Sequence, residues 1–226
     1  MLIMLAALAN VEGNSDFSNR HWDTIAGWAD YLLAKGLDPE NQLCTDDFAG
    51  HLAHNANLSA KAIMAIAGFA RLCAMTGRND VARRYEEKGR EMAAEWMKIG
   101  DDGGHFRLAF DQPGTWSQKY NLVWDSLLGL NIFPKEAVQK ETASYSERLR
   151  RYGLPLDNRR TYTKTDWQVW TGVLGGSPLL DEIVSRMFDF ANETPDRVPF
   201  SDWYETTDAR KSGFQARSVI GGVYMP

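Results

Sequence analysis

The sequence predicts an all-α protein, an (α/α) toroid of helical hairpins that is incomplete in this chain. Apolar, Gly- and Ala-rich helical segments alternate with charged amphipathic segments, and the alternation recurs about every 50 residues. A helix that is apolar on all sides has to be buried, whereas a helix with one apolar stripe covers something from outside. Alternating the two kinds therefore produces an inner ring of helices within an outer ring, with at most a short β-hairpin in a loop.

The inner helices are the segments with almost no charge. Lys61, Arg71 and Asp125 are their only charged residues. Because an unpaired buried carboxylate is costly, Asp125 is expected to face the ring axis or to find a partner. The predicted inner helices span residues 2–11, 58–75, 122–133, 167–175 and 218–225.

The outer helices each carry one apolar stripe, with steps of three, four and seven that keep it on one face. Gly36 and Gly77 stand where C-terminal caps are expected, and Pro134 and Pro178 stand at first helical positions. The predicted outer helices span residues 16–35, 81–99, 138–152 and 179–193.

A closed ring of six hairpins needs twelve helices, and the nine predicted here leave about three to come before residue 2, so the chain is expected to start inside the ring. We therefore interpret residues 1–226 as a single domain, the C-terminal part of a six-helical-hairpin toroid. A complete open helical solenoid is the alternative. The open ring also leaves self-association through its exposed inner faces as a partner hypothesis.

The composition is that of an ordinary globular protein, with 44% hydrophobic, 12% aromatic and 24% charged residues, which excludes disordered and collagen-like classes. The formal net charge of -5 offers no field for nucleic acid or an anionic membrane, so neither partner is expected. Two cysteines are too few for a disulfide scaffold. The apolar start, residues 2–11, is too short to span a bilayer and lacks the basic region of a signal peptide.

Four long connections, residues 36–57, 100–121, 153–166 and 194–217, are expected at one end of the ring, where binding and catalytic residues usually gather. In the first, Asp46 and Asp47 offer a carboxylate for acid/base work, with His51 or Asn55 orienting a substrate at the start of the next helix. Capping and turn formation would use the same residue types.

The second connection contains an alternating run, residues 105–110, that predicts a short strand. Lys119 follows it and is a candidate to neutralise a substrate carboxylate, with Trp116 and Tyr120 as a wall. The two rings fit a core position equally well.

In the third connection, Asp166 opens an inner helix as an N-cap or as a catalytic acid, and Asp157 is a second acid at the same end. In the fourth, Asp202 is followed by Trp203, an acid beside a stacking face. Arg217 is placed to bind a carboxylate in bidentate fashion or to close the loop through a pair with an aspartate.

No nucleophile elbow, P-loop, zinc-protease helix motif or dinucleotide-binding glycine motif is present, and the histidines are too scattered for a metal site. We expect no cofactor and no metal. Five long runs instead resemble the glutaminase A family: LCTDDFAGHLAHNANL at 43–58, PGTWSQKYNLVWDSLLGLNIF at 113–133, YGLPLDNRRTYTKTDW at 152–167, NETPDRVPFSDWY at 192–204 and GFQARSVIGG at 213–222.

The resemblance implies a six-helical-hairpin domain of the glycosidase toroid superfamily, within a larger secreted or periplasmic protein that carries a β-sandwich region upstream. It also implies hydrolysis of L-glutamine to L-glutamate and ammonia. Two other functions stay open: a glycoside hydrolase of the same superfamily, and a non-catalytic helical module that binds a carbohydrate or another ligand.

The residues themselves favour water-mediated hydrolysis of an amide or glycosidic bond in a small polar substrate, an amino acid or a sugar. Asp46 or Asp47 would pair with Asp202 or Asp166, one as base and one as acid. Substrate contacts are assigned to the remaining polar and aromatic residues of the connections: His51, Asn55, Trp116, Lys119, Tyr120, Asp125, Asp157, Trp203 and Arg217.

Overall fold

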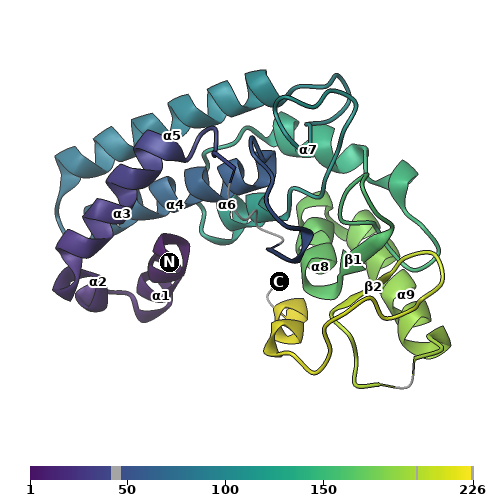
Figure 1. The fold of residues 1–226 in the computed structure, drawn as a ribbon. Coiled ribbons are helices and arrows are strands. Elements are labelled where there is room, and N and C mark those ends of the chain that lie inside the picture. The colour runs from purple at the N-terminus through teal and green to yellow at the C-terminus, as the bar shows by residue number, and fades with distance from the viewer. Residues whose placement is uncertain (42–46, 197, 225–226) are drawn as a thin grey trace.

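A computed structural model describes residues 1–41, 47–196 and 198–224 of the chain. Figure 1 shows an open arc of helices, with α1, α4, α6, α8 and η4 toward its inner side and α5, α7 and α9 along its outer side. This arrangement confirms the all-α class and the alternation of inner and outer helices. The helices are α1 (Leu2–Glu12), α2 (Asp16–Arg20), α3 (Trp22–Lys35), α4 (Ala56–Met75), α5 (Asn79–Gly100), α6 (Val123–Leu127), α7 (Lys135–Ala143), α8 (Thr165–Gly175) and α9 (Ser177–Glu193).

The α4 helix is the centre of the N-terminal half of the arc, between α1, α3 and α5. It begins where Asn55 Oδ1 accepts a hydrogen bond from the Leu58 N–H at 2.7 Å, a normal N-cap contact. It is long and apolar enough to cross a membrane, but the domain buries 72% of its most apolar window, as for the core helix of a globular domain.

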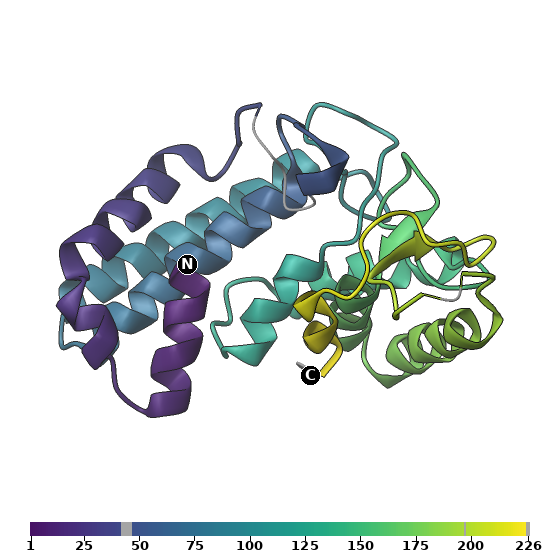
Figure 2. The same cartoon turned by 60° about the horizontal axis from the view of Figure 1, so that its bottom comes forward.

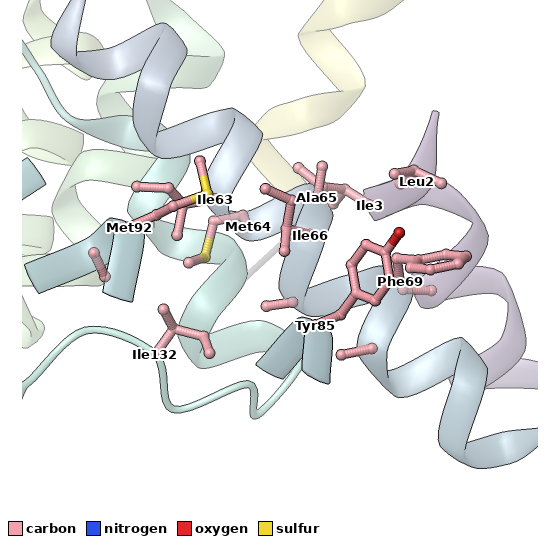
Figure 3. Packing of buried hydrophobic residues seen from close by; sticks show 14 of the residues in the cluster. Leu2, Ile3, Ile63, Met64, Ala65, Ile66, Phe69, Tyr85, Met92 and Ile132 are labelled. Atoms are coloured by element: carbon pink, nitrogen blue, oxygen red, sulfur yellow. The ribbon is translucent and has the colours of Figure 1, made fainter. Parts of the chain in front are cut away.

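The main core forms where α4 meets α1 and α5 (Figure 3). Phe69 of α4 packs edge-on against Tyr85 of α5, with ring centroids 4.7 Å apart. Trp96 of α5 is fully buried, and its Nε1–H donates to the Ala56 carbonyl at 2.8 Å. Because the Trp96 N–H has an acceptor, this large ring can be buried without an unpaired donor.

A second core fills the C-terminal half, between α8, α9 and the segment that follows α7. Its buried members include Tyr145, Leu154, Val169 and Ile183. The short 3-10 helices of the chain are η1 (Asp47–Ala49), η2 (Tyr120–Leu122), η3 (Ser146–Arg148) and η4 (Ser218–Tyr224).

Two predicted helices are shorter than expected because local hydrogen bonds end them. The helix predicted over 122–133 stops at Leu127, after which the Asp125 carboxylate accepts the Ile132 and Phe133 N–H groups and closes a turn. The helix predicted over 138–152 corresponds to α7 (Lys135–Ala143), which ends at Ala143. The predicted final helix, 218–225, is the 3-10 helix η4 over its described residues.

Two further expectations are wrong in detail. The predicted helix 16–35 breaks at His21, where φ is -118°, into α2 and α3. The alternating run 105–110 is not a strand: it forms only isolated bridges, Asp101 with Phe106 and Asn55 with Ala109. At His21 the break is local, since the His21 N–H donates to the Ser18 carbonyl at 3.1 Å, whereas the run 105–110 bonds to the distant residues 54–56.

The strands β1 (Tyr162–Lys164) and β2 (Trp203–Glu205) pair antiparallel, with Tyr162 opposite Glu205 and Lys164 opposite Trp203. They come from the third and the fourth long connection, so the pair is a long-range one and not the local hairpin that the sequence allowed. Their pairing fixes the end of the third connection, directly before α8, against the fourth.

The arc is open between α1 and η4, which lie on either side of the gap in Figures 1 and 2. On α1, Leu2, Leu5 and Ala9 are buried, whereas Met4 is 57% exposed and Val11 is 85% exposed. An inner helix thus has one apolar side in solvent.

Candidate functional site

Pairing of β1 with β2 places Lys164 and Asp202 side by side. Lys164 is the last residue of β1, Asp202 directly precedes β2, and the Thr165 N–H donates to the Asp202 carbonyl at 3.0 Å. The Lys164 ammonium forms an ion pair with Asp202 Oδ2, and the side chains are 3% and 0% exposed. The short sheet thus holds a buried ion pair at the N-terminus of an inner helix.

Asp166 is a second acid near this ion pair. The α8 helix begins at Thr165 with Lys164 at the N-cap position, so Asp166 lies in the first turn and is not the N-cap residue. Burial raises the pKa of the Asp166 carboxyl to about 6, and the nearby charge of Asp202 acts in the same direction, while Lys164 and the first backbone N–H groups of α8 oppose it.

Each of the two acids keeps one oxygen without a donor. Asp166 Oδ1 and Asp202 Oδ1 are buried and have no hydrogen-bond partner among the described residues. Arg217 Nη1 is 3.7 Å from the other oxygen of Asp202, Oδ2. Since buried carboxylate oxygens are normally satisfied, the two Oδ1 atoms are acceptors for a donor that binds there, such as a water, an amide or an ammonium group.

Aromatic rings enclose the Lys164 ammonium. Its Nζ lies 5.8 Å, 5.2 Å and 5.7 Å from the ring centroids of Phe48, Trp167 and Phe214. Tyr120 stacks on Trp167 at 4.4 Å with an angle of 8° between the rings. The ring faces favour the cation and keep water from it, which strengthens its attraction for Asp202.

A groove of about 890 Å³ lies beside this cluster, and Phe48, Tyr162 and Trp203 form part of its wall. Trp203 also packs on Phe48, with centroids 4.4 Å apart. Gly213 is needed beneath Trp203, because a Cβ there would lie 2.2 Å from the indole ring. The rest of the groove is largely charged: Arg159, Arg160, Glu205, Asp208, Arg210 and Lys211.

We define the site cluster as Lys164, Asp166, Asp202 and Arg217, with the surrounding rings. Of the residues that the sequence singled out, the structure brings Asp166, Asp202, Trp203 and Arg217 together, and Tyr120 joins them through Trp167. Asp46 and the side chain of Asp47 lie outside the described residues. Their neighbour Phe48 contacts Trp203, Tyr162 and Trp167.

Four other candidates have structural partners away from the cluster. Asn55 caps α4, and Asp125 accepts two N–H groups of the turn after α6. Asp157 forms an ion pair with Arg159 at 2.6 Å and accepts the Arg159 N–H at 2.8 Å. Trp116 lies beneath the Arg148 guanidinium, 5.0 Å from the ring centroid. His51 is exposed.

Lys119 is placed in the interior, not on a substrate-facing surface. Its side chain is 0% exposed, and Nζ contacts Glu141 at 3.3 Å together with the Phe106 and Ser117 carbonyls and the Ser117 hydroxyl at 3.0 Å. Four acceptors around one ammonium use all of its donors. The expectation that Lys119 receives a substrate carboxylate therefore gives way to a role in joining α7 to the second connection.

Sequence reasoning missed Lys164, Phe48 and Phe214. A lysine directly before an apolar helix and two residues before an aspartate was the available signal for Lys164. The rings gave none, because their meeting depends on the β1–β2 pairing. Among the described residues, no group of three or more His, Cys, Asp and Glu side chains is placed to hold a metal ion.

Comparison with known proteins relates the whole chain to one family. The family described as "Glutaminase A six helical-hairpin domain" matches residues 1–226. Glutaminase A of Aspergillus oryzae is 33% identical over 231 residues, which cover 99% of this chain and 34% of that protein. A protein of Arthroderma benhamiae named as a probable glutaminase is 30% identical over 227 residues, which cover 86% of this chain and 26% of that protein. The chain thus spans about a third or less of the length of these relatives.

Proposed function

Because the chain belongs to the glutaminase A six-helical-hairpin family, we propose that it is part of a hydrolase that converts L-glutamine and water to L-glutamate and ammonia. One observation supports this reaction most strongly: two buried carboxylates share the site, and each has an oxygen free of donors among the described residues. Amide hydrolysis needs one group that takes a proton from water and one that gives a proton to the leaving nitrogen.

The two acids differ in the way that this division requires. Lys164 forms an ion pair with Asp202, and Arg217 Nη1 lies 3.7 Å from the same carboxylate oxygen. Burial raises the pKa of Asp166 to about 6, so its protonated form is accessible near neutral pH.

In the proposed step, ionised Asp202 accepts a proton from water as the water oxygen attacks the side-chain amide carbon of glutamine. The C–N bond then breaks, and the nitrogen takes the proton of Asp166 and leaves as ammonia. Asp202 ends protonated and Asp166 ionised, and proton exchange with solvent restores both. The acid/base pair is expected to supply a factor of about 10² to 10⁴ for each proton transfer.

The charged end of the substrate would be held by charges of the groove. The glutamine α-carboxylate suits the basic wall of the groove, to which Arg159, Arg160, Arg210 and Lys211 contribute. Secretion or a periplasmic location, and an upstream β-sandwich region in the parent protein, belong to the same proposal and rest on the family resemblance alone.

The test is ammonia release from L-glutamine by the chain, alone and within a longer protein that contains it. We expect Asp202→Asn and Asp166→Asn each to lower kcat by about 10²-fold or more. Asp181→Asn, an exposed aspartate of α9, is the matched control and should leave turnover unchanged. Unchanged turnover in both site variants would remove the carboxylates from the mechanism.

Glycoside hydrolysis is the second candidate, because Phe48, Tyr162 and Trp203 line the groove and sugar rings stack on aromatic faces. The same two acids could serve it. A panel of aryl glycosides assayed beside L-glutamine separates the two reactions. Turnover of a glycoside without ammonia release would favour the glycosidase, and no turnover of either would favour a non-catalytic binding module.

A further inference from the structure

Lys164 is a charged residue at the centre of the site cluster that the reaction scheme does not use directly. Its side chain is 3% exposed, and its ammonium is surrounded by Phe48, Trp167 and Phe214. A buried ammonium is retained only where a counter-charge and favourable dipoles compensate the loss of water. The Lys164 charge is therefore expected to have a role in relation to the two acids beside it.

The cations of the cluster contact the two acids unequally. The ion pairs that Lys164 and Arg217 make in the described part of the chain go to Oδ2 of Asp202, not to Asp166. The Thr165 N–H donates to the Asp202 carbonyl at 3.0 Å and so fixes Asp202 beside the end of β1. The unequal contacts are thus built into the β1–β2 pairing.

Two carboxylates within electrostatic reach in a buried place do not both stay ionised unless enough positive charge compensates them. Here the compensation goes to one member of the pair. The other, Asp166, feels Lys164 only at longer range and is dominated by burial, which raises the pKa of Asp166.

We propose that Lys164 is a positioning residue that assigns the two acids their roles, holding Asp202 in place as the base and leaving Asp166 as the proton donor. The roles rest on the proposed hydrolysis, whereas the division of charge rests on the contacts alone. Lys164 acts through Asp202 and is not placed in contact with substrate.

The charged groups that face the pair from the described elements are few. They are Lys164 at the end of β1, Asp166 in the first turn of α8, Asp202 before β2 and Arg217 before η4. Aromatic side chains of η1, α8 and the segment before η4 surround the Lys164 ammonium. Arg217 is 38% exposed, so solvent weakens its share of the compensation.

The first test needs no enzymatic activity. The carboxyl carbon of Asp166 is followed by ¹³C NMR in a pH titration of the chain. In Lys164→Gln, the Asp166 midpoint should rise, because the nearby charge of Lys164 lowers the pKa of Asp166 and because Asp202 then lacks its contacting cation. Lys164→Arg should retain most of the wild-type behaviour.

Lys140→Gln is the matched control, because Lys140 also pairs with an aspartate, Asp101, but lies outside the cluster. It should leave the Asp166 titration unchanged. If Lys164→Gln does not fold, Lys164→Arg decides the inference, since a retained charge should keep the Asp166 midpoint. An unchanged Asp166 midpoint in folded Lys164→Gln, or a shifted midpoint in Lys164→Arg, would overturn it.

The second test uses ammonia release in the protein that shows it. Lys164→Gln should move the alkaline limb of the kcat profile, which Asp166 sets as the proton donor, to higher pH, and Lys164→Arg should move it back, whereas a merely structural lysine would lower kcat equally at every pH. No ammonia release from any variant, together with the expected NMR titrations, would refute the proposed reaction while supporting the division of charge.

Discussion

Gly222 of η4 lies against Asp166 of α8 so closely that a Cβ on the glycine would be 2.9 Å from the Asp166 Cβ. The Trp170 Nε1–H also donates to the Gly222 carbonyl at 2.8 Å, so η4 is tied to the helix that carries the acid. The C-terminal 3-10 helix therefore covers the buried carboxylate and helps to set its environment.

Gly222→Ala should displace η4 and increase the exposure of Asp166. With more water at the carboxyl, its pKa should fall toward the ordinary value of about 3.9, and any ammonia release should fall with it. Gly221→Ala is the control, since a Cβ at Gly221 meets nothing within 4 Å. Equal NMR titrations of Asp166 in the two variants would show that η4 does not control this acid.

Asp166→Asn should stabilise the fold at neutral pH. A carboxyl whose folded-state pKa, about 6, lies above its unfolded-state value binds protons more tightly when folded, so stability falls as pH rises from about 4 to above 6. Removing the ionisable group removes that loss, which amounts to about 1 to 3 kcal/mol at pH 7. Urea unfolding at pH 4 and pH 7 checks the sign, because the variant should gain on the wild type only at the higher pH.

Asp125→Asn should have the opposite effect on stability. The Asp125 carboxylate accepts the Ile132 N–H at 3.0 Å and the Phe133 N–H at 2.8 Å. An amide offers one acceptor where the carboxylate offers two, so we expect a loss of about 1 to 3 kcal/mol in urea unfolding. Glu87→Gln, an exposed acid of α5, should change the free energy of unfolding by less than about 0.5 kcal/mol.

The buried pair of Lys119 with Glu141 should behave as a coupled unit. Lys119→Met leaves Glu141 charged and buried and should cost about 3 to 5 kcal/mol. Adding Glu141→Gln removes that charge but keeps an acceptor for the Phe106 N–H, so the double variant should be less unstable than the two single losses predict. Additive losses in a double-mutant cycle would contradict the coupling.

His54 should titrate above its ordinary value. Its Nδ1 lies 2.7 Å from Asp38 Oδ1, and this contact raises the pKa of the imidazole. The pair therefore adds stability that is fully present below about pH 6.5 and is lost as pH rises through the raised pKa. In an NMR titration, Asp38→Asn should lower the His54 midpoint, and a midpoint that stays put would rule out the contribution of Asp38.

Part of this architecture is readable along the chain, because it depends on local periodicity. The uncharged run that becomes α4 and the single stripe of α5 identify an inner and an outer helix, and α8 and α9 follow in the same way. The long connections predict where a candidate site lies, and residue type and position suffice to select Asp166, Asp202 and Arg217 as candidates. Local patterns carry this information because a helix face repeats within a few residues.

Other features depend on segments that meet only in the folded chain. The sequence suggests Asp125 and Lys119 as substrate contacts. In the structure, Asp125 accepts two N–H groups of the turn after α6, and Lys119 forms an ion pair with Glu141 of α7. The partner of Lys119 comes from a segment whose position depends on the whole fold, whereas the partners of Asp125 are backbone N–H groups of a nearby turn, which no side-chain pattern predicts.

The helical class, the alternation of buried and covering helices, and the family are all predictable from the sequence, since each depends on residue pattern along the chain. The ion pair of Lys164 with Asp202, and the burial of Asp166 beside it, exist only in the folded chain. That outcome depends on the register of β1 with β2, two short strands far apart in sequence, and on burial. Charge balance in a buried site is set by which groups lie within a few ångströms, which is a property of the packed chain.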